Sequence, residues 1–72
     1  MPEYVVKFLW DAGASVWIAT SEDIPGLVLE SGSFDALVER VRFAVPELLV
    51  LNGLSPKPLL SFSAFRQERI AL

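Results

Sequence analysis

The sequence predicts a small α+β domain in which an antiparallel sheet carries one helix on one face, in the order β-β-β-α-β. Three observations lead to this prediction. Short segments with period-two hydrophobicity, typical of strands, fill the N-terminal part of the chain. A single amphipathic segment with apolar residues at three- and four-residue spacing follows them. Another period-two segment comes last, and 72 residues suffice for one domain only.

Two strands joined by a tight turn are expected at the N-terminus. Residues 4–10 read YVVKFLW, an alternating run of aromatic and β-branched residues. Asp11 and Gly13 follow; an Asp side chain bonds its own backbone and Gly tolerates positive φ, so both favour a turn. Residues 15–20 read SVWIAT, and we expect them to complete an antiparallel hairpin.

An acidic corner and a short third strand are expected next. Residues 21–26 read SEDIPG, and the Pro-Gly pair is typical of a turn. Residues 27–30 read LVLE and are expected to form the strand, which the polar residues 31–33 then end.

One helix is expected to begin after Ser33, whose hydroxyl can accept a hydrogen bond from the first turn. Asp35 suits the positive end of the helix dipole. The apolar stripe of this helix consists of Phe34, Leu37, Val38, Val41, Val45, Leu48 and Leu49. Pro46 lacks an N–H, so we expect a kink or break near residue 45. Asn52-Gly53 is the expected C-cap.

The C-terminal part predicts a linker and a long final strand. Residues 54–58 read LSPKP, which cannot be regular structure, and residues 59–72 are expected to form the strand. We therefore expect one domain over residues 1–72.

Composition predicts self-association. Apolar residues make up 53% of the chain and mean hydropathy is +0.47, which is rich for a chain with so little interior. A homodimer or higher homo-oligomer would cover the excess apolar surface.

The longest apolar stretch is broken by Pro46 and Glu47, far short of the ~20 residues of a membrane span. The N-terminus lacks the pattern of a signal peptide, so we expect a cytoplasmic protein. The net charge of −3 argues against direct nucleic-acid binding.

Few side chains are available for catalysis. The chain contains no histidine and no cysteine, which removes the common general base and the thiolate ligands. Asp11, Glu22 and Asp23 could serve a metal-dependent hydrolase, but they flank opposite ends of the second strand. A small-ligand site beside Trp10 or Trp17 is the other alternative. We assign no catalytic residue, metal or cofactor.

Two regions are candidates for protein–protein contacts. Phe43 and Val50 fall on the helix face opposite the apolar stripe. The final strand carries Leu60, Phe62 and Phe65, and at a sheet edge it would offer unpaired backbone groups to another copy or a partner. We therefore expect a non-catalytic protein-interaction module and not an enzyme.

The acidic corner also carries a recognisable motif. An acidic residue precedes a hydrophobic-Pro-Gly step at Asp23, Ile24, Pro25 and Gly26, and a Gly-Ser pair opens the helix at residues 32–37. This pattern resembles the HicB-like antitoxin domain superfamily. It is closer still to a group of short uncharacterised bacterial single-domain proteins in that superfamily. Motifs shared with that group, in this order, are Trp10-Asp11, Val16-Trp17, residues 24–27 (IPGL), residues 45–49 (VPELL) and Glu68-Arg69-Ile70.

The resemblance implies a partial ribonuclease-H-like fold without the catalytic acids. HicB-type antitoxins bind and block a small HicA-type ribonuclease, and they self-associate. The implied partners are therefore a small basic toxin protein and further copies of this chain. Many antitoxins of this type also carry a C-terminal DNA-binding segment. The resemblance ends at Leu72, so we expect no separate DNA-binding domain.

Overall fold

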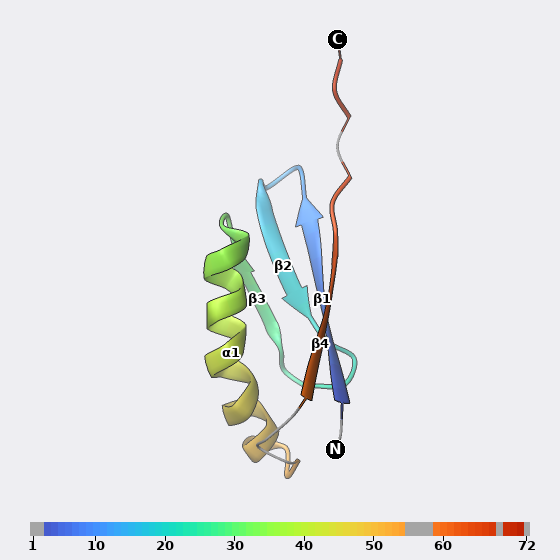
Figure 1. The fold of residues 1–72 in the computed structure, drawn as a ribbon. Coiled ribbons are helices and arrows are strands. Elements are labelled where there is room, and N and C mark those ends of the chain that lie inside the picture. The colour runs from blue at the N-terminus through green and yellow to red at the C-terminus, as the bar shows by residue number, and fades with distance from the viewer. Residues whose placement is uncertain (1–2, 55–58, 68, 72) are drawn as a thin grey trace.

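The computed structural model describes residues 3–54, 59–67 and 69–71, and it contains a four-stranded sheet with one helix on one face (Figure 1). The elements, in chain order, are β1 (Glu3–Asp11), β2 (Val16–Thr20), β3 (Val28–Ser31), α1 (Phe34–Leu51) and β4 (Leu59–Phe65). The predicted α+β class and the order β-β-β-α-β are confirmed.

The strand order in the sheet is β3-β2-β1-β4. β1 pairs antiparallel with β2, and β2 with β3, whereas β4 pairs parallel with β1. The sheet is therefore mixed, and the expectation of an antiparallel sheet is wrong for β4. The reason is the length of α1. An 18-residue helix spans about 27 Å and returns the chain to the end where β3 began, so the next strand runs parallel to β3 and β1.

The core lies between α1 and the face of the sheet that α1 covers. Cross-strand neighbours on this face include Phe8 with Ala19 and Val6 with Phe62. Among the described residues, the buried apolar side chains are Val6, Phe8, Ala19, Ile24, Leu27, Leu37, Val41, Val45 and Leu49. The stripe predicted for the helix supplies four of these nine residues, so its amphipathic pattern does place α1 on the sheet.

The helix begins and ends where the sequence predicts. The Ser33 hydroxyl accepts a hydrogen bond from the Ala36 N–H at 3.3 Å. At the other end, Gly53 has φ +69° and the Leu54 N–H donates to the Leu49 carbonyl at 2.8 Å, which is a Schellman motif. Of the kink or break expected near residue 45, the break is wrong, since α1 runs as one helix from Phe34 to Leu51 with Pro46 inside it. In the described part of the chain no helix is long and apolar enough to cross a membrane.

The final strand is shorter than predicted. β4 ends at Phe65, opposite Leu9, and the described residues beyond it run on without regular structure (Figure 1). At this point the Arg66 guanidinium lies 3.8 Å from the centre of the Trp10 ring. This cation–π contact fixes the first residue after β4 on the helix side of the sheet. The predicted linker falls largely outside the described residues, as do Glu68 and Leu72.

Candidate functional site

Side chains of the acidic corner continue the hydrogen bonding of β1 beyond the end of β2. The Asp23 carboxylate accepts a hydrogen bond from the Val5 N–H at 2.8 Å, and the Ser21 hydroxyl donates to the Val5 carbonyl at 2.6 Å. β2 ends at Thr20, opposite Lys7, so Val5 lies beyond the end of its antiparallel partner. Asp23 and Ser21 satisfy the backbone groups that a longer β2 would have paired.

The Pro-Gly step is a tight turn tied to the end of the helix. The Leu27 N–H donates to the Ile24 carbonyl at 3.3 Å, and Gly26 has φ +88°, as a type II turn requires at its third residue. Ile24 is fully buried in the core. The side-chain amide of Asn52 donates to the Pro25 carbonyl at 3.3 Å and so joins this turn to the C-cap of α1. Each residue of the motif therefore has an architectural role.

Replacing Asp23 with alanine is expected to lower the free energy of unfolding by about 1.5 kcal/mol, because the Val5 N–H loses a charged acceptor. Replacing Glu22 with alanine is the matched control. Glu22 is 90% exposed and lies 3.8 Å from the Lys7 ammonium, so its loss should cost under about 0.5 kcal/mol. Urea unfolding followed by tryptophan fluorescence measures both. Equal stability of the two variants would contradict this role for Asp23.

The candidate acidic residues are not brought together. The Asp11 carboxylate caps the hairpin turn and accepts hydrogen bonds from the Gly13 and Ala14 N–H groups at 3.0 and 3.2 Å. Asp23 is bonded to Val5 near the opposite end of β1, roughly 20 Å away along that strand. No group of three acidic residues that could hold a metal ion occurs among the described residues. The acidic turns thus form no shared site.

A continuous row of aromatic rings lies on the helix side of the sheet. Ring-to-ring distances along the row are 5.4 Å for Phe62–Phe8, 5.1 Å for Phe8–Phe34, 4.9 Å for Phe34–Trp17 and 5.5 Å for Trp17–Trp10. Such edge-to-face and tilted pairs are favourable beyond their buried area. Trp10 and Trp17 lie directly opposite one another on β1 and β2 and pack across the two strands. The Arg66 guanidinium closes the row at Trp10, a contact that the sequence did not predict.

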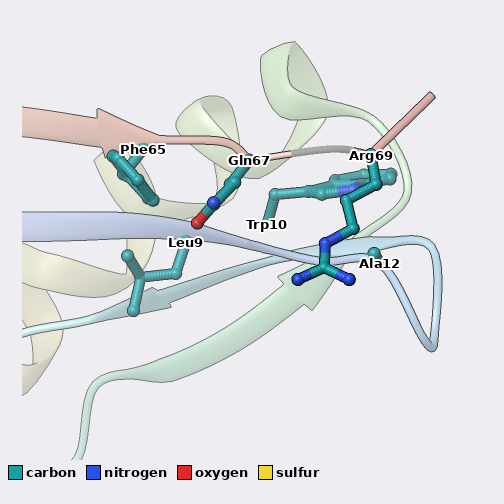
Figure 2. A pocket seen from close by; sticks show the side chains of 6 residues that line it. All are labelled: Leu9, Trp10, Ala12, Phe65, Gln67 and Arg69. Carbon is teal, nitrogen blue, oxygen red and sulfur yellow. The ribbon is translucent and has the colours of Figure 1, made fainter.

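A surface hollow lies where β1 continues past the end of β4 (Figure 2). Its volume is about 860 Å³, and it is lined by Leu9, Trp10, Ala12, Phe65, Gln67 and Arg69. Trp10 is half-buried and the other five side chains are exposed, so the hollow is open to solvent. The Trp10 indole N–H is buried without a hydrogen-bond partner among the described residues. For the small-ligand alternative, this hollow is the candidate site beside Trp10.

The candidate interface residues lie on three different surfaces. Phe43 and Val50 are exposed on the outer face of α1, 76% in the case of Phe43. Leu60 and Phe62 lie on the helix side of β4, and Phe65 lies on the uncovered side. Phe62 and Phe65 are 44% and 62% exposed. A single flat contact cannot use all five residues.

Sequence reasoning missed further exposed apolar side chains. Leu51 extends the outer surface of α1, and Leu9 lies beside Phe65 on the uncovered side of the sheet. Val28 is exposed on the same side, in β3. The sequence did contain a signal for an exposed Leu9. Apolar residues occur at both odd and even positions of β1, so they lie on both faces of the strand, and only one face is covered by the helix.

The fold and these surfaces define a small two-layer α+β domain with one uncovered sheet face and exposed apolar side chains at one sheet edge. The chain belongs to the family described as "Domain of unknown function (DUF1902)", whose profile matches residues 3–71. It is similar to a hypothetical protein from the extremely thermophilic bacterium Thermus thermophilus, seen in a crystal structure. The TM-score is 0.74 and the sequence identity 31%, covering 97% of this chain and 99% of the other. No curated protein matches this chain.

Proposed function

We propose that this chain is a non-catalytic protein-interaction module that self-associates in the cytoplasm. As a HicB antitoxin-like domain, it would bind and block a small basic ribonuclease of the HicA type. The observation that carries the proposal is the division of roles among its side chains. Asp11 and Asp23 accept backbone hydrogen bonds, while Phe43, Phe62 and Phe65 stand exposed.

The outer face of α1 offers an exposed hydrophobic anchor. Phe43 lies between Glu39 and Glu47, which are four residues away on either side and therefore on the same helix face. Arg42 pairs with Glu39 at 3.6 Å, and Arg40 lies near Phe43, so this face surrounds an exposed aromatic anchor with charges of both signs. The net charge of −3 of the whole chain attracts a basic partner at longer range.

The motif supports the antitoxin-like assignment indirectly. Asp23, Ile24, Pro25 and Gly26 are the residues through which the sequence resembles HicB-type domains, and they build the corner that joins β1, β2 and α1. A likeness centred on architectural residues supports a shared fold. The partner itself is inferred from the resemblance, from the exposed Phe43 on the helix face and from the net charge of −3.

The test begins with tagged protein as bait in a lysate of the native organism. Each stoichiometrically captured protein is then purified alone and assayed for RNA cleavage, with and without added bait. The proposal predicts a small basic ribonuclease whose activity falls as bait is added and is abolished at stoichiometric amounts. A captured ribonuclease that stays active with excess bait, or captured proteins that cleave no RNA, would contradict the antitoxin-like assignment.

Replacing Phe43 with glutamate is expected to weaken binding of that ribonuclease by at least about tenfold, because a charge replaces the central apolar anchor. Val28→Glu is the matched control. Val28 is 71% exposed, and it lies on the sheet face that α1 does not cover. The affinity of the Val28→Glu variant for the ribonuclease should therefore be unchanged. Isothermal titration measures both. Equal affinities would move the partner site away from the outer face of α1.

A further inference from the structure

The two edges of the sheet differ in how they are protected. β3 is four residues long and carries Glu30, whose carbonyl accepts a hydrogen bond from the Arg40 guanidinium at 2.8 Å. β4 is seven residues long, and its sequence LLSFSAF contains no charge and no proline. Its register with β1 runs without interruption from Glu3↔Leu59 to Leu9↔Phe65. β4 therefore lacks the charges, prolines and bulges that keep edge strands from pairing.

The edge at β4 also exposes one aromatic residue on each side of the sheet, with Ser61 and Ser63 beside Phe65 on the uncovered side. α1 packs against β2 and β3, near the opposite edge of the sheet from β4 (Figure 1). Phe62 faces the helix side but is still 44% exposed, since no helix covers it. Phe65 faces the other side and is 62% exposed. A strand added beside β4 would cover Phe62 on one side and Phe65 on the other while satisfying the free backbone groups of β4.

The order of residue types in β4 is the same in both directions. Phe62 is the central residue of β4. In each direction from Phe62, the next residue is a serine and the following two residues are apolar. When such a strand pairs antiparallel with itself about Phe62, Ser61 faces Ser63 of the second copy, and apolar residues face apolar residues. A two-fold interface requires this kind of self-complementarity. The absence of charge in β4 means that two copies, each of net charge −3, can meet here without opposing like charges.

We propose that β4 pairs antiparallel with β4 of a second copy, about a two-fold axis at Phe62, to form a continuous eight-stranded sheet. The axis is perpendicular to the sheet, so both helices lie on the same side. The two Phe62 rings then meet between the helices and extend the aromatic row of each copy across the interface. This inference rests on the self-association proposed above and assigns it to one strand.

The chain contains no cysteine, so a single introduced cysteine reports this geometry directly. Residues directly opposite in an antiparallel pair have Cα atoms about 4.5–5.5 Å apart, within the range a disulfide bridges. Phe62→Cys should therefore form a covalent dimer in near-complete yield under mild oxidation. Phe65→Cys is the matched control on the same strand. Its two copies would lie roughly 20 Å apart, so it should stay uncrosslinked.

A second pair of variants keeps the Phe62 ring in place. Ser61→Cys and Ser63→Cys should each remain uncrosslinked alone and form a disulfide when mixed in equal amounts, because residue 61 faces residue 63 of the other copy. Circular dichroism confirms that each variant is folded. Crosslinking of Ser63→Cys alone, or no crosslink in the mixture, would overturn the axis at Phe62.

The mass of the unmodified protein separates this inference from the proposed function. A dimer whose cysteine variants fail to crosslink as expected would overturn the pairing of β4 and leave self-association standing. A chain that stays monomeric at every concentration would overturn both.

Discussion

Replacing Ile24 with alanine is expected to lower the free energy of unfolding by about 3 kcal/mol. Ile24 is the apolar member of the motif turn, and its side chain is fully buried in the core. Truncation removes buried apolar surface and leaves a cavity that the tight turn, held at Gly26 and Asn52, cannot collapse to fill. Small domains of this size have little stability in reserve, so a large unfolded fraction at 37 °C should result.

Leu51→Ala is the control for this prediction. Leu51 lies at the last turn of α1 and is 80% exposed, so the same kind of truncation should change stability by less than about 0.5 kcal/mol. Urea unfolding monitored by circular dichroism gives both values. If Ile24→Ala were no less stable than Leu51→Ala, the corner would not be anchored in the core as described.

Replacing Phe8 with alanine is expected to have the largest effect, about 4 kcal/mol. The Phe8 ring is fully buried and contacts Phe34 of α1 and Phe62 of β4, with ring centres 5.1 and 5.4 Å away. It therefore connects the helix to the edge strand. Its loss should leave the chain largely unfolded, so that calorimetry shows no cooperative unfolding transition.

Phe8→Leu provides the comparison for that variant. Leucine restores most of the apolar volume but not the edge-to-face contacts, so its cost should be closer to about 1.5 kcal/mol. Equal unfolding of the two variants would indicate that ring geometry outweighs volume at this site. A stable, cooperative Phe8→Ala variant would contradict the central position assigned to this ring.

The features predicted correctly from sequence are those that depend on local chemistry. Ser33 caps the helix because a hydroxyl accepts from the first turn, whatever the rest of the fold. Asn52-Gly53 ends it because Gly adopts positive φ, and the same property places Gly26 in the corner. The exposure of Phe43 followed from its phase on the helix alone.

The errors concern features that depend on distant parts of the chain. Pro46 removes one backbone hydrogen bond, but Val45 and Leu49 beside it are buried against the sheet and hold the helix together. The direction of β4 depends on where α1 returns the chain, and the end of β4 depends on how far β1 extends beside it. None of these is encoded in the local pattern of residues.

The candidate site was predictable in its residues but not in its arrangement. The bond from the Val5 N–H to Asp23 joins positions 18 residues apart, and the stacking of Arg66 on Trp10 joins opposite ends of the sequence. Period-two alternation places Phe62 and Phe65 on opposite sides of one strand. It does not say that this strand lies at an edge that the helix leaves uncovered.

The most direct test of the interaction-module account is the mass of the purified chain in solution. Sedimentation equilibrium across the micromolar to millimolar range measures it without a tag or a partner. The account predicts a mass that rises to twice the 8.0 kDa of one chain, or a higher multiple, as concentration increases. A mass of 8.0 kDa at every concentration would contradict self-association and leave the exposed edge at Phe62 unexplained.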